Sequence, residues 1–473
     1  MDAYERFDEM TRNAAQAFKE IDKKEVIRLV SHLDADGISA ASIMIKLLNN
    51  DNRRYSVSIV QQLNRAVVSQ LAAEHYSCFI FTDIGSGVIK DILELLHGKK
   101  VIVLDHHSVE ENVDFGDVVF LNPHICGIDG GKEISGAGVV FKFACAVDKG
   151  MEDIAHVAII GAIGDLQEQN GFLRLNEEIL KVAVNKGKIK VAKGLRIFGT
   201  QTKPLHKALE YCTDPFIPGV SGSESGAIQF LHQIGIDPKN GKGWKKIVHL
   251  KEEEMKKLVT GIIMKRLNEA NPDDVLGNVY ILPHEEEESP TRDAKEFSTL
   301  LNACGRLGRA SYGIGACLGD KKIKQQAIRS LADYKREIVN ALNWYNENKH
   351  SDDVMWGSGF AIINARNNVM STMIGTLASI LSKSNLMTNN TFILSMARAE
   401  DNNTKISLRT TNNINGVLDL RKIIEEMIQG IGNSESGGHQ NAAGAVIPSD
   451  REEFFIGAAK EILGRYALEE KIG

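Results

Sequence analysis

Four stretches of the chain place aspartate and histidine side chains at or near the ends of apolar runs. The first stretch, 31–37, reads Ser-His-Leu-Asp-Ala-Asp-Gly and continues an apolar run that begins at 25. The other three follow apolar runs at 78–81, 101–104 and 157–163. The residues concerned are His32, Asp34 and Asp36, then Asp83, then Asp105, His106 and His107, and finally Asp165.

Carboxylates and imidazoles gathered in this way suit divalent cations. In an open parallel sheet the carboxyl ends of the strands share one edge, and ligands bind there. Several carboxylates in one crevice repel each other unless a cation lies between them. A mixed set of imidazole and carboxylate ligands is typical of a transition ion of the manganese or zinc kind. The sequence therefore predicts a two-metal hydrolytic site.

Each motif alone has an ordinary structural alternative. A single aspartate at a strand end, such as Asp83 or Asp105, is often only the N-cap of the next helix. The pair His106-His107 could be buried for packing alone. The complete set in this order favours the metal site, because one cation cluster explains all of its members together.

The composition of the chain is that of an ordinary globular protein, and its length of 473 residues predicts two or three domains. No run is apolar enough for a membrane span, and the charged pattern at 1–24 argues against a secretory signal. The six cysteines form no C-x-x-C pair, so we expect reduced, buried thiols and a cytoplasmic protein. The net charge of −6 gives no overall attraction for nucleic acid, so a polyanion would need a local basic surface or the metals.

The first 165 residues alternate strand and helix patterns, which predicts an α/β fold with a parallel sheet covered on both faces. Strands are expected at 25–31, 55–60, 78–84, 100–105 and 117–121, and helices at 37–49, 64–74, 88–97 and 137–149. A basic stretch at 180–209 precedes a turn-rich break near 213.

A second α/β pattern begins after the middle of the chain. Apolar residues spaced by three and four predict a long amphipathic helix at 321–347. Strands are then expected at 360–365, 391–396 and 405–410, with helices at 371–382 and 417–429 and a loop at 435–444 before a last strand and helix. These patterns predict a metal-binding domain at 1–212, an inserted, mainly helical middle domain at 213–352, and a smaller C-terminal α/β domain at 353–473.

The ordered acidic set resembles that of the DHH phosphoesterase superfamily, which is named after the triplet Asp105-His106-His107. More closely, the chain is similar to the archaeal RecJ-like nucleases, the GINS-associated nuclease group. The matching segments are Phe81-Thr-Asp-Ile-Gly-Ser-Gly87, Ile134-Ser-Gly-Ala-Gly138, Ile217-Pro-Gly-Val-Ser-Gly222, Asn302-Ala-Cys-Gly-Arg-Leu-Gly-Arg-Ala-Ser311 and Gly437-Gly-His-Gln-Asn-Ala-Ala-Gly444.

The resemblance implies a role for each member of the acidic set. It implies two divalent metal ions, of which manganese is favoured and magnesium is the other candidate. One ion would be held by His32, Asp34 and Asp83, and the other by Asp36, Asp83, His106 and Asp165, with Asp83 bridging. His107 would face the scissile phosphate and Asp105 would orient the histidine pair. The set is complete, which argues against the inactive relatives that serve as helicase scaffolds.

We expect substrate contacts outside the metal set. Gly437 and Gly438 can take positive φ beside His439, so their backbone N–H groups could converge on an anion, and Arg409 offers a bidentate phosphate partner in the same predicted domain. An ordinary glycine turn and a surface arginine remain the alternative. Arg306 and Arg309 belong to a second basic cluster, for which a solvated helix face and a nucleic-acid path are equally open.

These features predict a metal-dependent exonuclease that hydrolyses single-stranded DNA or RNA in replication or repair. No basic stretch rich in aromatic residues stands out, so we expect a cutter that does not read base sequence. One alternative is a phosphodiesterase of oligonucleotides, cyclic dinucleotides or polyphosphate. Another is a partner of the GINS complex or the replicative helicase, which is compatible with catalysis. Digestion polarity, the choice between DNA and RNA, the physiological ion and the oligomeric state stay open.

Overall fold

The computed structural model describes residues 2–109, 113–168, 171–241, 243–384, 390–399, 402–411, 418–432 and 434–472; the side chains of 240, 439 and 469–472 are outside this description. The chain forms two compact units, Met1–Leu331 and Ala332–Gly473. The division falls within one helix, α13 (Lys321–Asn348). The expected domain limits at 212 and 352 stay predictions.

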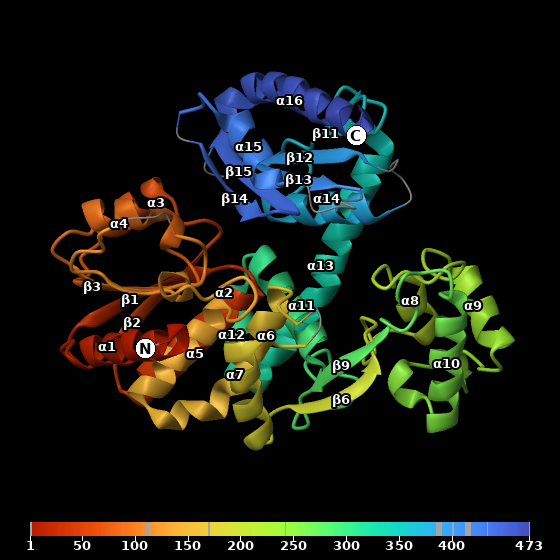
Figure 1. Ribbon diagram of the computed structural model, residues 1–473, viewed down its shortest axis with the longest axis horizontal. Coiled ribbons are helices and arrows are strands. Elements are labelled where there is room, and N and C mark those ends of the chain that lie inside the picture. The colour runs from red at the N-terminus through yellow and green to blue at the C-terminus, as the bar shows by residue number, and fades with distance from the viewer. Residues whose placement is uncertain are drawn as a thin grey trace. The chain divides into compact units, whose positions relative to one another are not determined.

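The first unit is built on a parallel sheet with the strand order β2-β1-β3-β4-β5 (Figure 1). The apolar residues of β1, β3 and β4 are buried on both faces, as is usual where helices cover a parallel sheet on both sides, whereas those of the edge strand β2 are half-buried. The strands are β1 (Val26–His32), β2 (Arg54–Val60), β3 (Cys78–Thr82), β4 (Lys100–Leu104) and β5 (Val119–Leu121).

Two groups of helices cover the two faces of this sheet. One face packs against α3 (Arg65–Ala72) and α4 (Ile89–Leu95), and the larger core on the other face includes α1, α2, α5 and α6. The helices of this larger core and its margin are α1 (Ala3–Lys19), α2 (Ala35–Asn50), α5 (Gly136–Val147), α6 (Ala155–Gly164), α7 (Arg174–Asn185), α11 (Ala294–Arg306) and α12 (Ala310–Cys317).

An antiparallel ribbon of β6 (Lys190–Leu195) and β9 (Leu276–Ile281) leads out to a small helical region with its own apolar core. The basic stretch of the sequence analysis therefore runs through the end of α7, through β6 and into α8. The elements of the region are α8 (Leu205–Glu210), α9 (Glu224–Gln233), β7 (Lys239–Asn240), β8 (Gly243–Trp244) and α10 (Glu252–Lys265).

The second unit contains a mixed sheet with the order β10-β11-β12-β13-β15-β14. One face packs on α15 (Leu420–Ile428) and α16 (Glu452–Ile472), and the other on α14 (Ile374–Lys383) and the second half of α13. The strands are β10 (Val354–Gly357), β11 (Phe360–Asn364), β12 (Phe392–Arg398), β13 (Asn403–Thr410), β14 (Glu435–His439) and β15 (Ala442–Pro448).

The α/β class and the covered parallel sheet are confirmed, and one local expectation was wrong. The segment 435–444 is not a loop: its first part is β14, paired antiparallel with β15. The error arises from a short, glycine-rich segment, whose pattern does not separate strand from loop. The apolar run at 157–163, for which no element was predicted, lies in α6, and Asp165 is the C-cap of this helix. No helix of the described residues is long and apolar enough to cross a membrane.

Helix α11 is tied to the start of the helical region by a buried carboxylate. Glu296 is 3% exposed and accepts hydrogen bonds from the backbone N–H of Gln201, at 2.8 Å, and from the hydroxyl of Thr202. Burial raises the pKa of Glu296 to about 7, although both hydrogen bonds lower it. The folded protein therefore binds a proton that the unfolded chain releases at lower pH.

We expect the free energy of unfolding to fall as pH rises from about 4.5 to about 7, and Glu296→Gln to remove this part of the slope. The shift corresponds to a contribution on the order of 3 kcal/mol. Urea unfolding of wild type and variant at pH 5, 6 and 7.5 measures it. The exposed Glu269→Gln is the control, and parallel curves for wild type and Glu296→Gln would contradict the assignment.

Two adjacent phenylalanines of α16 give a matched test of the core of the second unit. Phe455 is fully buried, whereas Phe454 is 57% exposed. We expect Phe455→Ala to lower the free energy of unfolding by about 3–5 kcal/mol, because it leaves a cavity in the core. Phe454→Ala should change it by less than about 1 kcal/mol. Chemical denaturation followed by circular dichroism measures both changes, and equal losses of unfolding free energy for the two variants would contradict this packing.

Candidate metal centre

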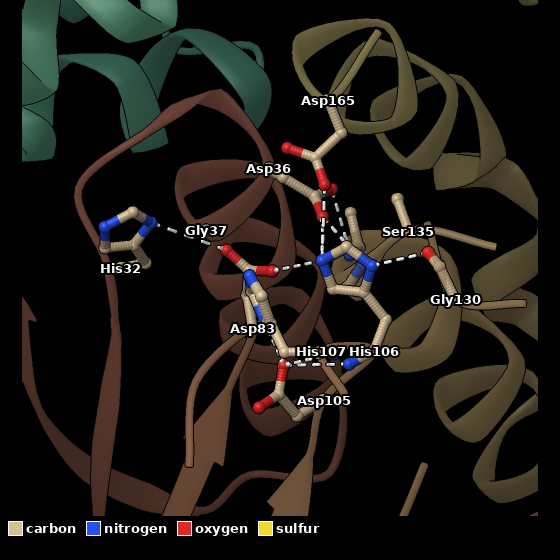
Figure 2. A network of polar contacts seen from close by, with 12 residues as sticks. His32, Asp36, Gly37, Asp83, Asp105, His106, His107, Gly130, Ser135 and Asp165 are labelled. Atoms are coloured by element: carbon tan, nitrogen blue, oxygen red, sulfur yellow. Dashed lines mark hydrogen bonds and ion pairs between the residues drawn. The ribbon is translucent and has the colours of Figure 1, made fainter. Parts of the chain in front are cut away.

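Two of the expected ligands and Asp105 lie at one edge of the parallel sheet because their strands end in register. Ser31 of β1 pairs with Thr82 of β3, and Thr82 pairs with Leu104 of β4. The next residue along each strand is then His32, Asp83 and Asp105. The register therefore brings together residues that are far apart in the sequence (Figure 2).

Two further aspartates come from the start of α2, directly after β1. Asp34 is the N-cap of this helix and accepts a hydrogen bond from the backbone N–H of Gly37 at 2.9 Å. Asp36 lies in the first turn, is 1% exposed, and accepts from the N–H groups of Gly136 (2.6 Å) and Ala137 (3.1 Å). These N–H groups begin α5, so the positive end of a second helix stabilises this buried carboxylate.

The first ligand group contains His32, Asp34 and Asp83, each with one ligand atom within 4.8 Å of the others. His32 Nδ1 lies 2.9 Å from Asp34 Oδ2 and 3.8 Å from Asp83 Oδ2. Burial alone would raise the pKa of Asp34, but the charge and hydrogen bond of His32 hold it well below its usual range. The group thus offers a charged carboxylate beside an imidazole.

The second ligand group contains Asp36, His106 and Asp165 around one imidazole nitrogen. His106 Nε2 lies 3.2 Å from Asp165 Oδ2, 3.3 Å from Asp83 Oδ1 and 3.7 Å from Asp36 Oδ2. His106 Nδ1 lies 2.7 Å from the carbonyl oxygen of Gly130. Because a carbonyl only accepts, Nδ1 carries a proton, and in the neutral ring Nε2 presents its lone pair to three carboxylates.

This arrangement fits a divalent cation. Asp83 Oδ1 and His106 Nε2 are buried, and neither makes a hydrogen bond among the described residues. Burial and the neighbouring Asp36 raise the pKa of Asp83 well above its ordinary value, and the same two causes raise that of Asp165. Burial lowers the pKa of His106, but contact with Asp83 and the charges of Asp165 and Asp36 raise it well above its usual range. Without a cation, protons must offset the crowded negative charge.

His107 is held by a different acceptor and has a different environment. Its Nδ1 lies 2.8 Å from Asp105 Oδ1, and its side chain is 46% exposed. Asp105 also accepts from the backbone N–H groups of Ser86, at 2.8 Å, and of His106, at 2.8 Å. Burial would raise the pKa of Asp105, but the charge and hydrogen bond of His107 hold it well below its usual range. Asp105 therefore orients the ring of His107, whereas the ring of His106 is fixed by Gly130.

Glycines that carry no ligand atom leave space for the site. A Cβ on Gly136 would lie 2.2 Å from Asp83 Oδ1, and one on Gly161 would lie 2.4 Å from Asp36 Oδ1. Asp83 itself has a φ of 62°, a left-handed conformation that turns the chain sharply after β3. The segment 134–138 belongs to the family resemblance, but spacing along the chain does not reveal its approach to Asp83, so its role could not be predicted.

The expected substrate residues are divided between the two units. Arg306 ends α11, and Arg309, which donates to Ser330 Oγ, precedes α12 in the first unit. In the second unit Arg409 donates to the carbonyl oxygen of Ala443 at 3.3 Å.

The glycine pair lies on the strand next to this carbonyl. Gly438 pairs with Ala443, and only Gly438 of the two glycines has positive φ, at 127°. Arg409 and Gly438 therefore adjoin the same residue of β15. The side chain of His439 lies outside the described residues.

Family models match three parts of the chain. They are the DHH family, N-terminal domain, over 26–164, the DHH-CID domain over 197–279, and the DHHA1 domain over 359–465. The chain belongs to the DHH phosphoesterase family, and this membership, together with the assembled acidic set, indicates a hydrolase of phosphoesters.

A relative covers almost the whole chain. Uncharacterized protein MJ0831 of Methanocaldococcus jannaschii is 32% identical over 444 residues, which is 93% of each protein. The single-stranded-DNA-specific exonuclease RecJ of Bacillus subtilis is 29% identical over 168 residues, or 33% of this chain and 21% of that one.

Solved structures share the fold at low sequence identity. CDC45 from Entamoeba histolytica gives a TM-score of 0.64 at 12% identity, covering 98% of this chain and 99% of that one. RecJ from Thermus thermophilus in complex with Mn²⁺ gives 0.58 at 16% identity, covering 96% of this chain but 55% of that one. The RecJ/CDC45-like fold is therefore common to all three proteins.

We expect Gly136→Ala to weaken Mn²⁺ binding strongly, because its new methyl group must displace Asp83 Oδ1 or the start of α5. The matched control is Gly87→Ala, where a Cβ would meet nothing within 4 Å. Isothermal titration with Mn²⁺ should show at least about a tenfold loss for Gly136→Ala, the scale of changes next to a ligand. Equal affinities for the two variants would contradict the geometry.

Proposed function

We propose that this protein is a metal-dependent exonuclease that hydrolyses single-stranded DNA or RNA, with two divalent ions, manganese foremost and magnesium as the alternative. The observation that carries the proposal is the shared position of Asp83. Its Oδ2 faces the group of His32 and Asp34, while its Oδ1 faces His106. A carboxylate between two ligand groups is the natural bridge for a pair of cations.

In this proposal His32, Asp34 and Asp83 hold one ion, and Asp36, Asp83, His106 and Asp165 hold the other. Bound there, the ions would acidify a water molecule and neutralise charge on the phosphate. The chain's own residues bind and orient. Gly130 keeps the Nε2 lone pair of His106 directed at the ligand group. Asp105 accepts from the Nδ1–H of the half-exposed His107, so its Nε2 would donate a proton or hydrogen bond to a phosphate oxygen from the doubly protonated ring.

Two features support a nucleic-acid substrate over a small one. The chain is partially similar to the single-stranded-DNA-specific exonuclease RecJ of Bacillus subtilis, at 29% identity over 168 residues. Arg409 and the backbone of Gly437 and Gly438 offer a phosphate grip in a separate unit, and Arg306 offers a cation at the end of α11. With a net charge of −6, binding would depend on such local groups.

Two other functions, a small-substrate phosphodiesterase and a partner of the replicative helicase, can be distinguished by experiment. A phosphodiesterase of oligonucleotides, cyclic dinucleotides or polyphosphate would share the metal chemistry and release product faster from short substrates. Binding of the GINS complex or the replicative helicase through the middle region is compatible with catalysis. It is tested by co-purification with the full chain and with a chain that lacks 205–265, because these residues have an apolar core of their own.

We expect 5′- and 3′-labelled single strands of DNA and RNA to be degraded in Mn²⁺ and spared in a chelator. Asp83→Ala should lower the rate by more than about a hundredfold, because even changes beside a ligand reach that size. Asp117→Ala, an exposed aspartate of the same unit, should leave the rate unchanged. Digestion that survives both the chelator and Asp83→Ala would refute the proposal, and faster cleavage of dinucleotides than of long strands would favour the small-substrate alternative.

A further inference from the structure

One face of α11 lies against the loop that carries three of the expected ligands. Ser298, Asn302 and Gly305 are spaced by four and three residues and therefore share a side of the helix. The loop runs from His32 at the end of β1 to Asp36 in the first turn of α2. The segment 302–311 matched the nuclease resemblance, yet the acidic set gives it no role.

Asn302 makes a hydrogen bond to the middle of this loop across 267 residues of sequence. Its Oδ1 accepts from the backbone N–H of Ala35 at 3.0 Å. Ala35 is the first residue of α2 and is fully buried, so its N–H has neither a helical partner nor access to bulk water. Asn302 therefore satisfies a donor that the helix itself leaves unpaired.

Ala35 lies between two ligands that belong to different ligand groups. Asp34, on one side, belongs to the ligand group of His32, while Asp36, on the other, belongs to the group of His106. The peptide N–H held by Asn302 thus lies between the two groups. A rotation of this peptide would change the separation of the Asp34 and Asp36 carboxylates.

At Gly305 the approach of α11 to the loop leaves no room for a side chain. A Cβ on Gly305 would lie 1.6 Å from the carbonyl oxygen of Leu33, which separates His32 from Asp34. A Cβ on Gly164 of α6 would lie 2.8 Å from Cβ of Ala35 and 3.4 Å from Ser298 Oγ. Backbone packing therefore holds the loop from two helices, and Asn302 adds the directional contact.

We propose that Asn302 is a positioning residue that sets the spacing of the two metal positions by holding the N–H of Ala35. This inference rests on the proposed two-metal function. It assigns to α11, a helix that supplies no ligand, control over a loop that supplies ligands to both groups. Partners of this kind orient the ligands of metal sites, and their loss costs affinity.

The test measures Mn²⁺ binding to the full chain, without reference to catalysis. We expect Asn302→Ala to weaken at least one of two Mn²⁺ equivalents by about 10- to 100-fold in isothermal titration. The spin-coupled signal of a close Mn²⁺ pair in electron paramagnetic resonance should also diminish. Asn302→Asp keeps an oxygen at the helix start, where negative charge is favoured, and should bind within about threefold of wild type. Asn340→Ala, an exposed asparagine of α13, is the control.

Thermal unfolding in a chelator separates positioning from folding. Asn302→Ala should remain folded without metal, and if it does not, Asn302→Ser, too short to reach Ala35, carries the same expectation. Unchanged binding by the Ala or Ser variant, or Asp binding as weakly as Ala, overturns the inference. If wild type itself binds no pair of Mn²⁺ ions, the proposed function fails, which is a distinguishable result.

Discussion

The structure of the first unit depends on one electrostatic constraint, the convergence of carboxylates on the lone pair of His106 Nε2. Three carboxylates approach this buried nitrogen to between 3.2 and 3.7 Å, while the other ring nitrogen is committed to Gly130. Carboxylates gathered around one buried atom repel each other, which is costly unless a cation or a proton joins them. The fold must therefore provide enough rigid contacts to hold these carboxylates together against their mutual repulsion.

Helix starts supply part of that support. Asp34 caps α2, and Asp36 accepts two N–H groups from the start of α5, so both carboxylates meet the positive ends of helices. The sheet supplies the rest, because β1, β3 and β4 end in register and cannot shift singly without breaking their ladders. The site is thus held largely by backbone hydrogen bonds, while Asp83 Oδ1 accepts no hydrogen bond among the described residues and is available for a ligand.

The sequence predicted the ligand residues of this site better than the residues that hold those ligands in place. Aspartate and histidine at the ends of apolar runs are visible because strand pattern and residue type coincide at His32, Asp83 and Asp105. Asp165 was found as an acidic residue after an apolar run, although that run is a helix, since a short buried helix and a buried strand have the same composition.

The residues that hold the ligands in place could not be predicted, because they act through backbone atoms or lie far from the ligands in the sequence. Gly130 contributes a carbonyl oxygen, which no sequence pattern marks. Asn302 contacts a residue 267 positions away, and the need for Gly136 appears only when Asp83 is placed beside it. For the same reason the segment 435–439 was expected to be a loop: the pairing with β15 that makes it a strand lies outside its own sequence.

The two adjacent histidines differ in the acceptor that holds each ring. The Nδ1–H of His106 donates to the carbonyl oxygen of Gly130, which fixes the tautomer with the Nε2 lone pair toward the carboxylates, and the residue is 2% exposed. Such a ring suits a metal ligand, which must be neutral to bind. His107 faces the carboxylate of Asp105 through Nδ1, and its side chain is half exposed. Asp105 thus fixes one ring and Gly130 the other, so the position of Asp105 before the pair is as much a part of the site as the histidines themselves.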